Sequence, residues 1–353
     1  MKYFFKSGLT LLCVMMFVGC KNETKQSKLA VAKDSPEGMV WVESKTFLQG
    51  AKESDAYAMP REKPAHRVSV YGFFIDISEV TNVQFKKFVD STKYVTVAER
   101  YIDWEEIKVM LPEGTTKPND STFRPGSLIF NKNVKAVASM ENYFQWWTWQ
   151  VGANWKHPSG PESSIDGKDN YPVVHIALED ALAYCKWANR RLPTEAEWES
   201  AAQGTNTDAI FTWGNDASVL DSNANTWQGT FPIKNEIKDG FEFISPVKSY
   251  PPNSIGLYDM SGNVWELTSD LFDINHYKKL DISAPILNPK GSSISFDGGN
   301  PNEIENTIKG GSFLCNASYC ASFRISAKMG FELDSSSDHV GFRTVVTKEM
   351  LKK

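Results

Sequence analysis

The sequence predicts a single α+β domain with little regular secondary structure, and three observations support this prediction. The 353-residue chain is 41% hydrophobic and 23% charged, an ordinary globular composition that can bury a sizeable core. Short helix and strand patterns alternate with long stretches that show no periodicity. The chain has 11 Trp and 12 Tyr, whose rings suit irregular loops because one face packs while the polar edge hydrogen-bonds. No repeat, coiled coil or linker divides residues 37–350, so we expect one domain there.

The N-terminus predicts export and a lipid anchor. Lys2 and Lys6 flank an apolar run that is too short to span a bilayer, and a basic start before such a run is typical of a secretory signal. Cys20 directly after Gly19 resembles a bacterial lipobox, so residues 1–19 would be removed and Cys20 acylated; the alternative is a plain signal peptide with an incidental Cys. Residues 20–36 then form a flexible tether at a membrane of the cell envelope, on the periplasmic face of the inner or outer membrane.

The first half of the domain shows two strand patterns and one helix pattern. Residues 39–42 and 68–75 read as strands because they are rich in β-branched and aromatic residues. Thr81 or Asn82 can cap a helix whose apolar face includes Phe85 and Phe88. Residues 99–155 have no usable pattern.

The second half begins with a predicted strand at 172–176, followed by a helix whose apolar face is spaced at residues 178, 181, 182, 185 and 188. Thr194 and Glu197 have capping-box spacing, so another helix should start there. Residues 204–269 are rich in Gly, Asn, Asp and Trp without periodicity. Their aromatic content argues against disorder, and we expect polar or metal contacts to hold them.

Five cysteines are present, and only three remain after the expected processing. Cys13 leaves with the signal and Cys20 would carry lipid. Cys185 falls on the apolar helical face, which predicts a buried structural thiol. Cys315 and Cys320 differ, because they follow two consecutive glycines near the C-terminus.

The Cys315–Cys320 spacing permits two chemistries. Five residues apart, the two side chains point to different sides of a helix or strand, so they converge only if residues 316–319 turn. Gly310 and Gly311 allow the unusual backbone this needs. Two thiolates suit a soft monovalent metal such as Cu(I), whereas the alternative is a structural disulfide closing a small loop. A structural zinc site is disfavoured because the histidines show no paired ligand spacing.

Several segments, in order, resemble the formylglycine-generating enzymes (sulfatase-modifying factors). The most specific are Arg-Leu-Pro-Thr-Glu-Ala-Glu-Trp-Glu at 191–199 and Gly-Asn-Val-Trp-Glu at 262–266. The paired cysteines with Ser-Tyr between them match the catalytic branch of that superfamily. Other matching segments are residues 81–85, 152–158, 256–261 and 341–343, so the similarity spans about Met39 to Val345.

The resemblance implies a C-type-lectin-like α+β fold and an oxidase. Cys315 and Cys320 would hold Cu(I), and Ser312 and Tyr319 would position oxygen or the substrate thiol. The implied partner is a sulfatase polypeptide with a Cys-x-Pro-x-Arg-like motif. Its cysteine would lose hydrogen from Cβ in an O2-dependent step, and hydrolysis of the resulting thioaldehyde would give formylglycine.

The resemblance also implies two Ca2+ sites, built from hard oxygen ligands of the kind calcium prefers. Both lie in the part of the chain that shows no periodicity, where bound ions would explain the order. One site would use Asn225 and Asp239 with backbone oxygens of Thr226 and Phe241, and the other Asp259 and Glu266 with backbone oxygens of Gly262 and Val264.

Some positions depart from the family pattern near the expected substrate groove. Lys328 replaces Arg, His339 replaces Asn, and Asn316-Ala317 replaces a His-Arg pair, so the preferred target motif could differ. Cys185 matches a position that is disulfide-bonded in some relatives, but the partner position here is Thr344, so no such bond can form, and Ile325 likewise replaces a Cys found in some members.

Three other functions agree less well with this sequence. A non-catalytic envelope scaffold lipoprotein of the same fold would not need the two thiols. A non-haem iron sulfoxide synthase would need a histidine cluster that is lacking here. The net charge of −5 argues against nucleic-acid binding.

Overall fold

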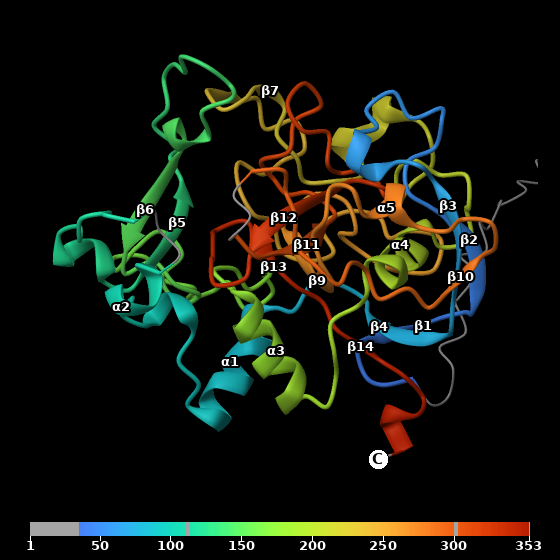
Figure 1. Cartoon of the computed structure of the whole chain (residues 1–353), viewed down its shortest axis with the longest axis horizontal. Helices are drawn as coiled ribbons and strands as arrows, with labels where there is room; N and C mark the ends of the chain where they lie inside the picture. Colours follow the sequence, from blue (N-terminus) through green and yellow to red (C-terminus); the bar gives the residue numbers. More distant parts are fainter. Residues whose placement is uncertain (1–34, 110–112, 300–302, 353) are drawn as a thin grey trace, which may run out of the picture. The chain divides into compact units, whose positions relative to one another are not determined.

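The computed structural model describes residues 35–109, 113–299 and 303–352 (Figure 1). The predicted signal peptide, residues 1–19, and most of the predicted tether, including Cys20, lie outside these ranges. Among the described residues, no helix has the length and apolarity needed to cross a membrane. The fold is α+β with low regular secondary structure, as predicted.

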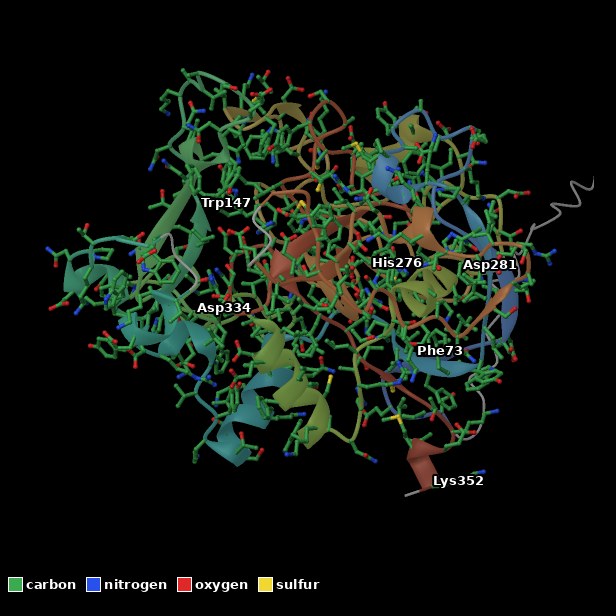
Figure 2. The ribbon with its side chains drawn as sticks, in the orientation of Figure 1. Phe73, Trp147, His276, Asp281, Asp334 and Lys352 are labelled. Atoms are coloured by element: carbon green, nitrogen blue, oxygen red, sulfur yellow. The ribbon has the colours of Figure 1, made fainter. Side chains whose placement is uncertain are left out.

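Two small sheets contain the N-terminal strands. Strand β4 pairs antiparallel with β1 on one side and β14 on the other, and Phe73 of β4 is buried against the core (Figure 2). In the second sheet β3 lies between β2 and β10. Their bounds are β1 Met39–Val42, β4 Phe73–Asp76 and β14 Val345–Val346, then β2 Lys45–Gln49, β3 His66–Val70 and β10 Ile286–Leu287.

A four-stranded sheet of order β12-β11-β9-β13 lies at the centre of the fold (Figure 1). The β11 strand is antiparallel to β12 and β9, and β13 runs parallel to β9. Most of β9 and β11 is buried, so the loop that leaves β11 starts from a rigid base. Their bounds are β9 Trp265–Leu271, β11 Glu305–Lys309, β12 Lys328–Glu332 and β13 Val340–Gly341.

The remaining strands form hairpins: β5 (Gly126–Phe130) with β6 (Trp147–Val151), and β7 (Gly229–Thr230) with β8 (Lys234–Asn235). The longer helices are α1 (Asn82–Thr92), α3 (Leu178–Trp187) and α4 (Glu195–Gln203). Shorter helical segments are α2 Trp104–Ile107 and α5 His276–Lys279, with 3₁₀ turns at Pro60–Glu62, Val97–Glu99, Asp120–Phe123, Tyr143–Gln145, Ala217–Ser222 and Met350–Lys352.

Local signals explain the helix starts. The Thr194 hydroxyl accepts the Glu197 N–H at 3.1 Å, and the Glu197 carboxylate accepts the Thr194 N–H at 2.9 Å, which confirms the predicted capping box of α4. Phe85 of α1 stacks on Tyr184 of α3 at 6.0 Å, so the two helices pack through their apolar faces. Cys185 is buried in the same cluster, as predicted.

Three sequence predictions were wrong in detail. The predicted strand 68–75 is two strands, β3 and β4, which separate at Tyr71 and belong to different sheets. Residues 172–176 are buried but do not form a strand, because His175 has a φ of +60° and only isolated backbone bonds reach neighbouring segments. Leu182 points to solvent although it falls on the expected apolar face of α3.

Candidate active site

Cys315 and Cys320 are brought together by a tight turn in the loop that follows β11. The backbone N–H groups of Tyr319, Cys320 and Ala321 all donate to the carbonyl of Asn316, at 3.1, 3.0 and 3.0 Å. Residues 316–319 therefore form the turn that brings the side chains of Cys315 and Cys320 together, as the sequence predicts. Both cysteines are free thiols, and the Cys315 thiol donates a hydrogen bond to the Cys320 sulfur.

The two sulfurs have opposite electrostatic environments. Cys315 is 2% exposed, and burial together with its role as hydrogen-bond donor raises its pKa well above the usual value. Cys320 is half-buried, and the hydrogen bond from Cys315 lowers its pKa to about 7 against the opposing effect of burial. Backbone N–H groups of Ser322 and Asn316 lower that pKa further. Near neutral pH a substantial fraction of Cys320 is therefore thiolate, the form that binds metals.

Ser312 and Tyr319 flank the pair, as the resemblance implies, but in different ways. Ser312 is fully buried, and its backbone N–H donates to the Cys315 sulfur at 3.4 Å. Tyr319 is 42% exposed and stacks on Phe231 at 5.0 Å, with the Trp146 ring edge-on at 5.8 Å. Ser312 thus supports the buried sulfur of Cys315. Tyr319, with Phe231 and Trp146, forms an aromatic wall that leads to the surface.

Asn316 is the residue that anchors the turn. Its buried side-chain amide donates to the carbonyls of Trp227 and Gly229, at 2.9 and 3.2 Å. Its side-chain oxygen accepts the Ser318 N–H at 2.9 Å. The departure from the family pattern at this position therefore has a structural role, because it ties the cysteine turn to a neighbouring loop.

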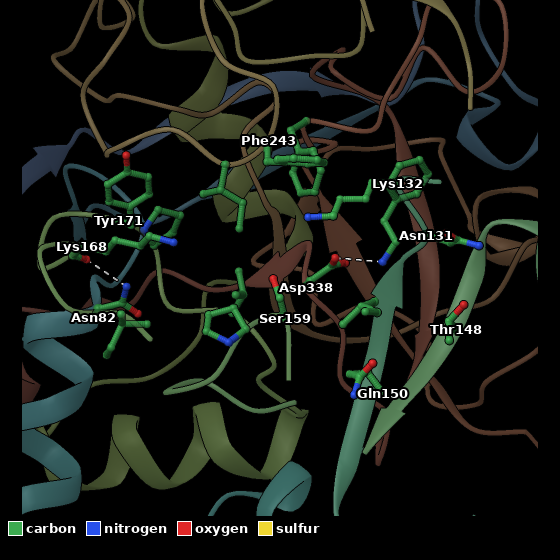
Figure 3. Close-up of a pocket in the computed structure, with 18 of the residues that line it drawn as sticks. Asn82, Asn131, Lys132, Thr148, Gln150, Ser159, Lys168, Tyr171, Phe243 and Asp338 are labelled. Carbon is green, nitrogen blue, oxygen red and sulfur yellow. Dashed lines mark hydrogen bonds between the residues drawn. The ribbon is translucent and has the colours of Figure 1, made fainter. Parts of the chain in front are cut away.

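A cavity of about 550 Å³ lies beside the cysteine loop (Figure 3). Phe313, which directly follows Ser312, lines it together with Phe130 and Phe243, while Lys132 and Asp338 contribute charged groups. Its size is typical of ligand-binding pockets. Burial raises the pKa of Asp338 to about 7. Cys315 and Cys320 do not line this cavity, so it neighbours the reactive sulfurs without enclosing them.

Lys328 and His339, two of the departures expected near a substrate groove, are both buried. The Lys328 ammonium lies 3.2 Å from Glu195 and 3.6 Å from the centre of the Tyr277 ring. His339 packs on Trp147 of β6 (Figure 2) at 4.7 Å. Glu195 therefore neutralises the positive charge of Lys328 inside the fold, away from the surface where a substrate peptide would bind.

The first implied calcium set is assembled in the structure. The Asp239 carboxylate accepts the backbone N–H of Thr226 at 2.8 Å and of Phe241 at 3.1 Å, which brings three of the four residues together. The side-chain oxygen of buried Asn225 has no hydrogen-bond partner. The Gln228 amide donates to the Thr226 carbonyl and to Asp239. An unpartnered oxygen and a carboxylate fit a hard cation here.

Only part of the second implied calcium set is free to bind an ion. One oxygen of Asp259 is buried without a partner, which fits a cation. Glu266, in contrast, accepts two bonds of 2.6 Å from Arg343 and one of 2.7 Å from the Trp198 indole. Within the described ranges no three His, Cys, Asp or Glu side chains are grouped to hold a metal, so both calcium sets depend on backbone or amide oxygens as well.

Asn263 and the rings of Trp146 and Phe231 beside Tyr319 are functional candidates that sequence reasoning missed. The Asn263 side chain accepts the Ser245 N–H at 2.9 Å and donates to Glu79 at 3.0 Å, and its carbonyl accepts the Phe313 N–H at 2.9 Å. Its backbone N–H donates to the Asn225 carbonyl at 2.9 Å, so Asn263 links the two candidate calcium segments to the cysteine loop. Its place in the Gly-Asn-Val-Trp-Glu block was the available signal.

The close approach at Gly311 leads to a stability prediction. Gly311 and Gly38 both have a φ of +73°, but an added Cβ at Gly311 would lie 2.8 Å from backbone of Ser322, whereas at Gly38 it would meet nothing within 4 Å. We expect Gly38→Ala to cost about 1–2 kcal/mol for the left-handed backbone. Gly311→Ala should cost about 1–3 kcal/mol more from overpacking. Chemical denaturation of both variants measures the difference, and equal losses would contradict the prediction.

The chain matches the family described as "Sulfatase-modifying factor enzyme 1-like domain" over residues 25–348. A formylglycine-generating enzyme of Mus musculus is 41% identical over 80% of this chain and 68% of its own length. The protein named "Inactive C-alpha-formylglycine-generating enzyme 2", also of Mus musculus, is 34% identical over 90% of this chain and 88% of its own. The structure of PvdO from Pseudomonas aeruginosa shares the fold, with a TM-score of 0.58 and 20% identity over 87% of this chain and 93% of that one.

Proposed function

The chain belongs to the sulfatase-modifying factor enzyme 1-like family, and from this membership we propose that it oxidises the active-site cysteine of a sulfatase to formylglycine in a copper- and oxygen-dependent reaction. The observation that supports this most directly is the Cys315–Cys320 pair. The two thiols are unbonded and in contact, and one of them, Cys320, is partly buried and has a lowered pKa. A structural thiol pair would not need a stabilised thiolate near the surface.

The donor set fits copper. Two sulfurs held together, with no hard oxygen ligand between them, match the preference of Cu(I) for soft thiolates. When bound, copper supplies a site for the substrate thiol and for activation of oxygen. Cys315 and Cys320 would hold the metal, and the buried backbone around Ser312 would keep Cys315 in place.

The other residues of the chain would bind and orient the substrate. The half-exposed Tyr319, backed by Phe231 and Trp146, offers a rigid aromatic surface beside the outer sulfur. A peptide packed on this surface would exclude water from the reacting cysteine. Two electrons and two protons would pass from the substrate cysteine to O2, which balances as H2O2, and water would then replace the sulfur, which leaves as sulfide.

Calcium and the lipid anchor are part of the same proposal. One ion would be bound by Asn225, Thr226, Asp239 and Phe241, and a second at Asp259 with backbone oxygens of Gly262 and Val264, where the resemblance also implies Glu266. The signal at residues 1–19 and acylation of Cys20 would present the enzyme at the cell envelope, where it would mature exported sulfatases.

A non-catalytic scaffold lipoprotein is the second candidate. The relative named as inactive is 34% identical over most of this chain. A protein with the family sequence can therefore be named inactive, which is the reason for this second candidate. The cysteine pair of this chain favours the oxidase.

The deciding experiment incubates the copper-loaded protein with a peptide containing a Cys-x-Pro-x-Arg motif and O2, and measures conversion of the cysteine by mass spectrometry. Conversion that requires both copper and oxygen is expected. A peptide with Ser in place of the reacting Cys is the control. Failure of several motif variants to show copper-dependent conversion would favour the scaffold.

A further inference from the structure

We propose that the cavity beside the cysteine loop binds a free apolar α-amino acid. The ammonium group of the ligand would lie at Asp338, its carboxylate at Lys132 and Lys168, and its side chain against phenylalanine rings. The cavity has a volume of about 550 Å³, which leaves room for an amino acid with bound water. The inference does not depend on the oxidase, because the cysteines do not line this cavity.

One wall of the cavity is aromatic and rigid. Phe130, Phe243 and Phe313 line it, and all three belong to or pack against one buried aromatic cluster. Phe130 lies edge-on to Trp227 at 5.5 Å, and Phe243 lies edge-on to Phe313 at 6.0 Å. The rings are therefore fixed before a ligand arrives. Such a wall suits an apolar side chain, and a ring face also attracts an ammonium group.

Asp338 contributes a carboxylate whose charge the surrounding residues do not balance. Its side chain is 18% exposed and lines the cavity, and one oxygen accepts the Phe130 N–H at 2.9 Å. The other oxygen is buried and has no hydrogen-bond partner. The His339 ring lies 4.0 Å away, but burial lowers its pKa to about 3, so this ring is neutral. A positive group in the cavity would therefore stabilise the carboxylate.

Two lysines give the same cavity positive charge. The side chains of Lys132 and Asp338 both point into the cavity, and Lys168 lies beside Tyr171 on the left of the view (Figure 3). Within the described ranges neither lysine ammonium forms an ion pair. A negative group on a ligand is the partner that both lysines lack, and a carboxylate can accept hydrogen bonds from two ammonium groups at once.

These charges select one class of small molecule. A simple amine would pair with Asp338 but would meet two lysines of like charge. A simple carboxylate would pair with the lysines but would leave Asp338 without a positive partner. An α-amino acid carries an ammonium and a carboxylate on one carbon, so it satisfies both. The hydroxyl groups of Thr148 and Ser159, which also line the cavity, add polar contacts for such a ligand.

The experiment measures binding to the mature chain by isothermal titration calorimetry. We expect L-phenylalanine and L-leucine to bind at least about tenfold more tightly than glycine, because burial of an apolar side chain is worth at least that factor. Phenethylamine lacks the carboxylate and N-acetyl-L-phenylalanine lacks the ammonium. Each should bind at least about tenfold more weakly than L-phenylalanine, because each loses a charge-assisted hydrogen bond.

Two variants with matched controls locate the site. Asp338→Asn should weaken L-phenylalanine binding by about 10–100-fold, because it removes the charge but keeps an oxygen for the Phe130 N–H. Lys132→Met should weaken it by about tenfold. Asp334→Asn and Lys87→Met are the controls, because both residues are exposed and neither lines the cavity, and they should bind as the wild type does.

The proposal is overturned if none of the amino acids binds at millimolar concentration, or if Asp338→Asn binds L-phenylalanine as tightly as the wild type. It is overturned equally if N-acetyl-L-phenylalanine binds as well as L-phenylalanine, which would mean that the cavity takes a carboxylate, such as a peptide C-terminus, without using Asp338. If Asp338→Asn does not fold, the ligand series and Lys132→Met decide. No readout uses oxidase activity, so the result is separate from the test of the oxidase.

Discussion

Replacing Cys320 or Cys315 by Ser should lower formylglycine formation by at least about a hundredfold, because loss of residues that only support a metal ligand already costs about 10–100-fold. A hydroxyl is a hard oxygen donor with a high pKa, so it neither binds Cu(I) well nor supplies a negative charge at neutral pH. The Cys315 variant should respond in the same way, since the proposed copper site uses both sulfurs.

The matched control is Cys185→Ser. Cys185 is also buried, but it belongs to the helical core, where burial raises its thiol pKa to about 12. Its replacement should leave the conversion of a motif peptide intact, although the fold will lose some stability. Turnover by mass spectrometry and copper content, measured on all three variants with circular dichroism as a check of folding, tests this. Full activity in Cys320→Ser would contradict the proposal that Cys315 and Cys320 hold the copper of an oxidase.

Arg324→Met should lower the free energy of unfolding by about 3–5 kcal/mol, the usual cost of leaving a buried charge without its partner. The guanidinium is fully buried and binds Glu62 through two bonds of 2.6 and 2.8 Å and Asp55 through one of 2.6 Å. Methionine fills a similar volume but leaves the carboxylates of Asp55 and Glu62 without a positively charged partner. Denaturant unfolding measures the loss.

Arg324 should also affect the reactive turn. Its Nε donates to the carbonyl of Ala321 at 2.9 Å, and Ala321, which directly follows Cys320, has a φ of +45°. Loss of this bond should therefore weaken copper binding in variants that still fold. The exposed Arg67→Met is the control, expected within about 0.5 kcal/mol of wild type. Adding Glu62→Gln to Arg324→Met should recover part of the lost stability, and a double variant no more stable than the single one would contradict this explanation.

Short-range patterns determined several features of this protein without the structure. The capping box at Thr194 and the burial of Cys185 follow from contacts within one or two helical turns, so spacing in the sequence was enough. The need for a turn at residues 316–319 followed from side-chain geometry in the same way. The family segments then placed the chain among the sulfatase-modifying factors, while the lipid anchor at Cys20 and the bound metals stay predictions.

Only the tertiary structure decided which distant groups meet. Residues 172–176 have a strand-like composition, but their backbone pairs with isolated positions of other segments, so no sheet forms. Lys328 is neutralised by Glu195 across a long stretch of chain. The physical reason is that periodicity and capping depend on neighbours along the backbone, whereas the pairing of buried charges depends on how whole elements pack, which no spacing in the sequence records.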